Sequence, residues 1–317
     1  MLLAAVFLLS ASLPRAQQPE PIRVNVDRVN VGVIVTDSRG KFVEGLRRED
    51  FHIFDNGVEE PLTDFAAVDE PAQVILLIEA GPAVYLLESG HLRAANALLQ
   101  GLSPGDRIAI VKYAATPESV VDFTANKQVA AAALDNLQFN LGFGQLNLSS
   151  SLLALFERLT AASRKKTIVL LSTGVDTSGE QAWQSLLNRL KLGDVRVLAV
   201  SLSGELQSVP PAKRKKAAPE SSALTAREFA EANQELQLIA EASGGRAYLP
   251  SNAKEFAAAY GQIAQLVRHE YSLAFAPAAR DGKVHAIEVR VTNQATDPAS
   301  PPAYRINHRR AYLAPAP

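Results

Sequence analysis

A chain of 317 residues is long enough to form two domains or one large domain around a substantial core. Its formal net charge of −1 and its 47% of apolar residues are those of an ordinary globular protein, and they give no sign of nucleic acid or an anionic membrane as a partner. Cysteine is absent from the sequence, which excludes structural disulfides, thiolate metal sites and lipidation of an N-terminal cysteine.

An apolar run opens the chain at residues 1–13 and ends at Pro14 and Arg15. Its length is that of the hydrophobic region of a signal peptide and is too short to span a bilayer. No lysine or arginine precedes the run, and Pro14 is unfavourable beside a cleavage point after Ala16, so an uncleaved anchor or a mis-set start is the alternative. We predict a signal peptide over residues 1–18, an exported protein (periplasmic or secreted), and no membrane span in the mature chain.

Residues 22–68 are predicted to form a small all-β segment, because apolar and polar residues alternate through much of it. Asn56 and Gly57 separate two such runs and both tolerate positive φ, which is a strong hairpin signal. After this turn we expect one polar strand that ends near Phe65. A few strands alone bury too little apolar surface to be stable, so the segment needs a partner.

Residues 72–268 are predicted to form an α/β domain in which strands and helices alternate. The unbroken apolar run at residues 74–78 is typical of a strand buried on both faces of a parallel sheet. Similar strand patterns recur, with helical patterns between them, at residues 107–113, 166–171 and 194–200. This order implies right-handed crossovers and a doubly wound, mostly parallel, Rossmann-like sheet. Ligands of such sheets bind at the carboxyl ends of the strands, so the first candidate site follows the 74–78 strand.

Residues 203–225 interrupt this alternation. The stretch contains three prolines and the basic run 213–216, and it shows no apolar period. Such composition favours a flexible, solvated insert, with a targeting or phosphate-binding patch as the alternative interpretation of the basic run.

Alternating apolar residues return at residues 270–313, with a turn at Asp281 and Gly282. Like residues 22–68, this segment has too few strands to be stable alone. We therefore predict that the N- and C-terminal β segments pair into one β-sandwich-like unit beside the α/β domain.

Short motifs follow one another in a defined order at residues 33–40, 45–46, 49–57, 105–109, 122–124, 164–174, 244–245, 271–275 and 309–312. This ordered set resembles that of von Willebrand factor type A (VWFA-related) domain proteins, and most closely a bacterial exported subgroup in which the domain lies between β segments. The resemblance covers nearly the whole mature chain. It implies the same α/β fold and a role in binding other proteins.

In that family the carboxyl edge of the sheet usually holds a metal-ion-dependent adhesion site, whose first loop reads Asp-x-Ser-x-Ser. The positions that correspond to the metal ligands depart from the pattern throughout. They are Glu79, Gly81 and Ala83 in the first loop, Leu146 in place of a threonine, and Thr173 in place of an aspartate, with Asp176 three residues further on.

A hard divalent cation such as Mg²⁺ requires oxygen ligands and normally at least one carboxylate. Gly81, Ala83 and Leu146 offer no side-chain oxygen, and Thr173 offers only a neutral hydroxyl. Glu79 keeps a carboxylate but is one methylene longer than the usual aspartate. The resemblance therefore implies a degenerate site without metal. A site rebuilt from Glu79, Ser149 and Asp176 is the alternative.

No other catalytic or cofactor-binding set emerges from the sequence. There is no Gly-x-Ser-x-Gly elbow and no phosphate-binding Gly-Lys-Ser/Thr loop. The serines at positions 149–151 are expected to cap a helix. The histidines show no metal-ligand spacing and are expected on the surface or in strands; they are His52, His91, His269, His285 and His308.

The sequence thus favours an exported, non-enzymatic protein-interaction module, adhesion- or scaffold-like, that binds another protein without metal. It predicts no small-molecule cofactor and no nucleic-acid partner. Two alternatives remain: a hydrolase that uses carboxylates such as Glu79 and Asp176 at the sheet edge, and a structural subunit of an envelope assembly.

Overall fold

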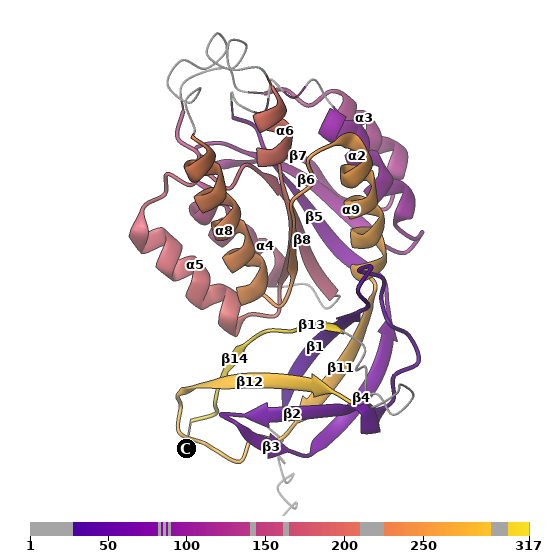
Figure 1. Ribbon diagram of the computed structural model, residues 1–317, viewed down its shortest axis with the longest axis vertical. Coiled ribbons are helices and arrows are strands. Elements are labelled where there is room, and N and C mark those ends of the chain that lie inside the picture. The colour runs from indigo at the N-terminus through magenta and orange to yellow at the C-terminus, as the bar shows by residue number, and fades with distance from the viewer. Residues whose placement is uncertain are drawn as a thin grey trace, which may run out of the picture.

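The structure, a computed structural model, consists of an α/β domain and a β-sandwich that lies below it in the view of Figure 1. The chain leaves the sandwich after Asp69 and returns to it at His269. The residues that the structure describes are 28–81, 84, 87, 90–139, 144–160, 165–209, 225–292 and 304–316.

A six-stranded sheet forms the centre of the α/β domain, with the strand order β10-β9-β8-β5-β6-β7. Neighbouring strands are parallel except β7, an edge strand, which is antiparallel to β6. The predicted fold class, a doubly wound and mostly parallel sheet with added β structure from the two ends of the chain, is confirmed. The strands are β5 (Ala72–Glu79), β6 (Arg107–Tyr113), β7 (Pro117–Thr124), β8 (Lys165–Ser172), β9 (Arg196–Ser201) and β10 (Arg246–Tyr248).

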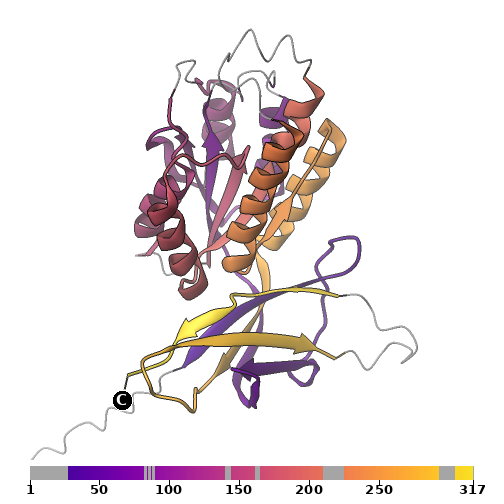
Figure 2. The same cartoon turned by 60° about the vertical axis from the view of Figure 1, so that its left-hand side comes forward.

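Helices cover both faces of this sheet, as Figure 1 and Figure 2 show. One face packs against α2 (Gly90–Gly101), α3 (Lys127–Asp135) and α9 (Ala253–Leu266). The other packs against α4 (Leu148–Thr160), α5 (Glu180–Leu192) and α8 (Ala226–Ala242). The starts of α3, α8 and α9 are fixed by N-cap side chains that accept backbone hydrogen bonds from the first turn, namely Asn126, Thr225 and Asn252.

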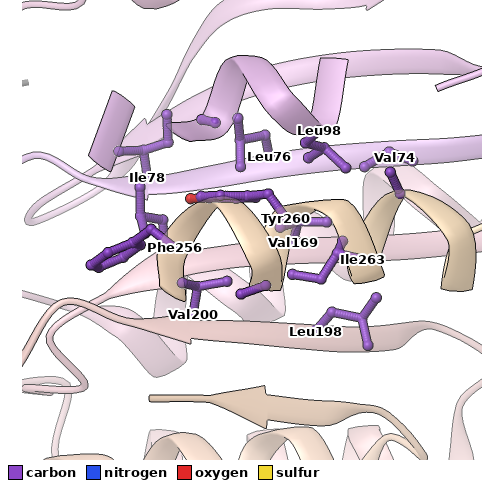
Figure 3. Close-up of a cluster of buried hydrophobic side chains, with 14 of the residues drawn as sticks. Val74, Leu76, Ile78, Leu98, Val169, Leu198, Val200, Phe256, Tyr260 and Ile263 are labelled. Carbon is purple, nitrogen blue, oxygen red and sulfur yellow. The ribbon is translucent and has the colours of Figure 1, made fainter. Parts of the chain in front are cut away.

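The central strand β5 is apolar along its length because helices bury both of its faces. Val74, Leu76 and Ile78 pack among side chains of α2 and α9, including Tyr260 and Ile263 (Figure 3). The alternate residues of the strand belong to a second apolar cluster with α4, α5 and α8. An unbroken apolar run is therefore the pattern that a strand between two helical layers requires.

The β-sandwich consists of two four-stranded sheets with the orders β13-β1-β11-β4 and β14-β12-β2-β3. Its strands from the N-terminal side are β1 (Val29–Thr36), β2 (Phe51–Asp55), β3 (Val58–Glu60) and β4 (Leu62–Asp69). Those from the C-terminal side are β11 (His269–Phe275), β12 (Val284–Val291), β13 (Arg305–Asn307) and β14 (Ala311–Leu313). Each sheet combines both sides, because β11 pairs antiparallel with β1 and β4, and β12 pairs antiparallel with β2.

Apolar residues from both sheets meet in one core between them, which includes Val33, Ile53, Leu273 and Ile287. Neither terminal segment could bury these side chains alone, so the two ends of the chain depend on each other for this core. We keep the division into residues 22–68, 72–268 and 270–313 as a proposal for the limits of the units.

The predicted hairpin at Asn56 and Gly57 is confirmed, since both residues have positive φ, 48° and 83°, between the paired strands β2 and β3. The single polar strand expected after this turn is wrong. The chain instead forms β3 and β4, which belong to different sheets. Pro61 lies between them and has no N–H to donate, so it interrupts the ladder and allows the chain to change sheets.

The insert expected at residues 203–225 begins later than predicted. Ser203–Ser208 forms helix α6 of six residues, in which Leu206 is buried in the core of the α/β domain. A helix this short shows no apolar period, so the sequence pattern did not reveal it. The rest of the expected insert, residues 210–224 with its basic run, lies outside the described residues.

The predicted signal peptide also falls on residues that the structure does not describe, 1–27, and stays a prediction. Among the described residues, no helix combines the length and the apolar character needed to cross a bilayer.

Candidate functional site

Glu79, the last residue of β5, lies at the carboxyl edge of the sheet with its side chain fully buried. One carboxylate oxygen, Oε2, accepts hydrogen bonds from Tyr113 Oη at 3.3 Å and Ser172 Oγ at 3.0 Å. The same oxygen accepts hydrogen bonds from Thr173 N and Thr173 Oγ1, each at 2.8 Å. Four donors therefore converge on a single oxygen atom.

Strand register explains why these donors meet. Tyr113 ends β6 and is paired directly with Glu79, and Ser172 ends β8 one position after the pair Ile78 and Leu171. Parallel strands that end together place their last side chains at one edge of the sheet. The hydroxyl oxygens of Tyr113 and Ser172 are also 2.8 Å apart, so these two side chains contact each other as well as Glu79 and the cluster is continuous.

Burial raises the pKa of Glu79, because desolvation disfavours the charged form, although the hydrogen bonds from Thr173, Ser172 and Tyr113 act in the opposite direction. Burial and the neighbouring Glu79 also raise the pKa of Tyr113 well above its ordinary value. The cluster contains no cation among its partners, and its donors are neutral hydroxyls and a backbone N–H.

The second carboxylate oxygen of Glu79, Oε1, is buried and has no hydrogen-bond partner among the described residues. A Cβ placed on Gly81 would lie 2.8 Å from Leu146 Cδ2 and 3.6 Å from Glu79 Oε1. Leu146 therefore packs directly against Gly81 next to the carboxylate, and a Cβ at position 81 would require the Leu146 side chain to shift.

Leu146 is held in this position by the loop that follows β8. Its backbone N–H donates to Thr177 Oγ1 at 2.9 Å, and its carbonyl accepts from Thr177 N at 2.7 Å. The next residue, Asn147, donates through Nδ2 to Ala115 O at 2.9 Å, and its N–H donates to Ala114 O at 2.8 Å. Three loops at the carboxyl edge are thus hydrogen-bonded to one another above Glu79.

Asp176 has a different set of partners from Glu79. It accepts hydrogen bonds from Ser149 N at 3.2 Å and from Ser149 Oγ, and its other oxygen accepts from Ser178 N at 2.9 Å. Ser149 lies in the first turn of α4, so Asp176 satisfies an otherwise unpaired N–H there and its charge lies at the positive end of the helix dipole.

The expectation that Ser149, Ser150 and Ser151 cap this helix is wrong. Their backbone N–H groups lie inside the first turn, and two of them are capped from outside, by Asp176 and by Ser178 Oγ at 3.3 Å from Ser150 N. The hydroxyl of Ser151 is buried without a hydrogen-bond partner among the described residues. A cap that comes from a loop distant in sequence leaves no local signal.

These residues do not fit a divalent cation. Gly81 and Leu146 offer no side-chain oxygen, and the accepting oxygen of Glu79 is already surrounded by protein donors. Thr173 donates its hydroxyl to Glu79, and Asp176 faces α4. Mg²⁺ needs about six oxygen ligands in a near-octahedral arrangement. Among the described residues no group of three or more His, Cys, Asp or Glu side chains could hold a metal ion.

The structure brings together four of the residues that the sequence selected, Glu79, Gly81, Leu146 and Thr173, whereas Ala83 lies outside the described residues. Sequence reasoning missed Tyr113 and Ser172. The available signal was their position in the chain, because both residues end apolar strand runs, and the carboxyl ends of parallel strands meet at one edge of the sheet. The assignment of these positions as a binding site stays a prediction.

Comparison with known proteins gives the class of the α/β domain. Residues 91–176 match the family model described as von Willebrand factor type A domain. These residues lie in the α/β domain, which is therefore similar to von Willebrand factor type A domains, a class of domain that mediates protein interactions. No curated protein matches the chain.

Similar solved structures include the conserved hypothetical protein BatB from Bacteroides thetaiotaomicron, with 14% identity, 62% of this chain and 98% of that chain covered, and a TM-score of 0.45. A von Willebrand factor type A protein from Catenulispora acidiphila has 12% identity, with 92% of this chain and 75% of that chain covered and a TM-score of 0.46. The manganese-loaded TRAP protein of Plasmodium vivax has 11% identity, with 84% and 100% covered and a TM-score of 0.43. These identities and TM-scores are too low to support an argument about function.

Proposed function

We propose that the chain is an exported, non-enzymatic protein-interaction module whose type A domain binds another protein without a divalent metal ion. The observation that supports this most directly is the state of Glu79, whose carboxylate is buried and has four protein donor atoms within hydrogen-bond distance of Oε2, while Leu146 packs against the neighbouring Gly81. Its Oε2 is thus occupied by protein donors, and its Oε1, which has no hydrogen-bond partner among the described residues, is buried away from solvent.

Export is part of the proposal because the apolar run at residues 1–13 has the length of a signal-peptide core. Absence of enzymatic activity is proposed because the two carboxylates that a hydrolase would use have structural partners. Glu79 is bound to strand-end hydroxyls and Asp176 to the start of α4. General acid–base catalysis needs a group that can reach the substrate, and Glu79 has no exposed surface.

In this proposal the partner contacts the outer surface of the carboxyl edge. Glu79, Gly81 and Thr173 are buried, so they support this surface from within and do not touch a partner. The exposed residues above them are neutral and polar for the most part, as Gln145 and Thr177 illustrate. A partner would therefore be recognised by shape and hydrogen bonds, not by a carboxylate that completes a metal coordination shell.

Thermal unfolding in millimolar Mg²⁺, Mn²⁺ or Ca²⁺ tests the metal-independent part of the proposal. A ligand present at a hundred times its dissociation constant stabilises the folded state by about 2.7 kcal/mol. For a domain of this size such stabilisation would raise the melting temperature by about 5 °C or more. We expect no rise with metal and no fall with a chelator.

A metal-dependent rise that is lost in Glu79→Gln or Asp176→Asn, and kept in Glu241→Gln, would contradict the proposal and show a rebuilt metal site. Glu241 is a suitable control because it is exposed at the end of α8, away from the carboxyl edge.

Pull-down from an envelope fraction tests the binding part. We expect the same partner to be retained in chelator and in Mg²⁺, and to be lost when the exposed edge residue Gln145 is changed to arginine. The matched control is Gln128→Arg, an exposed position on α3. Retention that requires Mg²⁺, or that is equally affected by both variants, would count against a metal-independent contact at this edge.

A further inference from the structure

A cavity of about 450 Å³ lies between the α/β domain and the β-sandwich, at the opposite end of the central sheet from Glu79. Its walls come from the amino ends of β8 and β9 on one side and from β1, β4 and β11 on the other. Charged side chains line it on both sides, namely Lys166, Asp194 and Arg196 from the α/β domain and Glu70, Glu270 and Arg309 from the segments around the sandwich.

Two of the three cations in this cavity already have a carboxylate partner. Lys166 Nζ lies 2.8 Å from Asp194 Oδ2. Arg196 Nη2 lies 2.9 Å from Glu270 Oε2, and both of these side chains are largely buried. The second pair joins the α/β domain to β11 and so fixes one wall of the cavity against the other. The positive charges of Lys166 and Arg196 are therefore largely compensated by their partners.

Arg309 differs from the other two cations. Its Nη2 donates to the backbone carbonyl of Asn30 at 2.7 Å, and no carboxylate among the described residues lies within ion-pair distance. Its Nε is buried without a hydrogen-bond partner among the described residues. Burial lowers the pKa of Arg309, which reflects a guanidinium whose charge is only partly compensated. The carboxylate of Glu70 is at the exposed rim, where water solvates it.

We propose that this cavity binds a small oxyanion, a carboxylate or phosphate group, with Arg309 as the principal contact and Lys166 facing it from the α/β domain. Arg309 is the cation of this lining that has no carboxylate within ion-pair distance among the described residues, and a guanidinium is suited to planar recognition of such groups. The volume is in the range of small-ligand sites, which form preferentially between domains. The bound group would contact the α/β domain and the sandwich together.

This site is independent of the partner surface proposed above. The carboxyl edge that carries Glu79 and the cavity that carries Arg309 lie at opposite ends of the same strands. An anion in the cavity would stabilise the contact between the two units, because it would interact with Arg309 on the sandwich side and with Lys166 on the other. Failure of either proposal would leave the other unaffected.

Isothermal titration calorimetry with the full chain tests this inference, with inorganic phosphate and acetate as separate probes and chloride at equal ionic strength as the reference. We expect saturable binding of at least one probe. The two probes distinguish a phosphate-selective from a carboxylate-selective site. Arg309→Gln should weaken the binding at least tenfold, whereas Arg39→Gln, an exposed arginine outside the cavity, should leave it unchanged.

A second variant keeps Arg309 in place and fills the cavity. Ala66 lines the cavity from the edge strand β4 and is exposed, so Ala66→Trp adds bulk there without disturbing the apolar core. We expect the same loss of binding in Ala66→Trp, with a melting temperature near that of the wild type. Binding that is absent for both probes, or equal in the wild type, Arg309→Gln and Ala66→Trp, would overturn the proposal.

Discussion

Each of the two structural units buries a carboxylate that accepts a hydrogen bond from a tyrosine, but the remaining partners differ. In the α/β domain, Glu79 accepts from Tyr113 at 3.3 Å, and its other donors are neutral. In the sandwich, Asp55 accepts from Tyr312 at 2.6 Å and also pairs at 2.7 Å with Nδ1 of His285. The first carboxylate has only dipoles around it, whereas the second has a group that can become a cation.

The difference determines which protonation state each site favours. Neutral donors do not offset the loss of hydration of a buried charge, so burial raises the pKa of Glu79. The ring of His285 contacts Asp55 through Nδ1 and Asp281 through Nε2 at 3.2 Å. Only the imidazolium can donate at both nitrogens, so these contacts raise the pKa of His285. One buried carboxylate thus has only neutral donors around it, and the other pairs with a histidine whose charged form it favours.

Among the substitutions that test this comparison, Glu79→Ala is expected to change the free energy of unfolding most. The change removes the shared acceptor of Tyr113, Ser172 and Thr173 at a site that water does not reach, so buried donors lose their partner. We expect the free energy of unfolding to fall by about 2–4 kcal/mol, and by less in Glu79→Gln, which keeps one acceptor oxygen. Urea unfolding measures both. Glu241→Ala, an exposed control, should change it by less than about 0.5 kcal/mol.

A smaller effect is expected from Asp55→Ala in the sandwich. Tyr312 and His285 would lose their acceptor, but His285 would keep Asp281, so we expect a loss of about 1–3 kcal/mol. Hydrogen exchange of the β12 amides is the most direct measurement, because β12 contains His285 and pairs with the strand of Asp55. Faster exchange in the α/β domain with unchanged β12 would contradict the assignment of this cluster to the sandwich.

The elements of the central sheet were accessible from the sequence because their apolar runs and the intervening helical patterns are local. The apolar run from Val74 to Ile78 predicts a strand buried on both faces, and this prediction needs no knowledge of the neighbouring strands. The split at Pro61 was not recognised, because the pattern alone does not say that a strand changes sheets. The expectation for His308 is also wrong, since it is buried outside the strands. Burial lowers its pKa to about 4, a state that depends on tertiary packing.

The candidate site was also only partly predictable, because some of its contacts join residues that are distant in sequence. The motif positions Glu79, Gly81, Leu146 and Thr173 come from one aligned pattern, and the structure places them together. The hydrogen-bond partners of Glu79 come from strand ends more than thirty residues away, with separations of 34 and 93 for Tyr113 and Ser172. Such contacts depend on the register between strands, which a single sequence does not specify.

The pH dependence of stability is the smallest expected effect and the one that distinguishes the two carboxylates best. The pKa of Glu79 in the folded chain is raised above its ordinary 4.5, so its contribution to stability is complete below about pH 4.5 and is lost as pH rises through the folded value. The pKa of His285 is raised above 6.5, mainly by Asp55 and with help from Asp281, so its contribution is complete below about pH 6.5 and is lost at higher pH.

Both groups therefore make stability fall with rising pH, the Glu79 contribution from about pH 4.5 upward and the His285 contribution from about pH 6.5 upward. Urea unfolding between about pH 5 and 9 should show a decline above about pH 6.5 that is smaller in His285→Gln, since glutamine can donate to Asp55 but does not titrate. Glu79→Gln should reduce the decline that begins below about pH 6.5 and should keep the part of the decline that His285→Gln removes. Equal pH slopes in the wild type and His285→Gln would show that Asp55 and His285 do not form an ion pair in the folded sandwich.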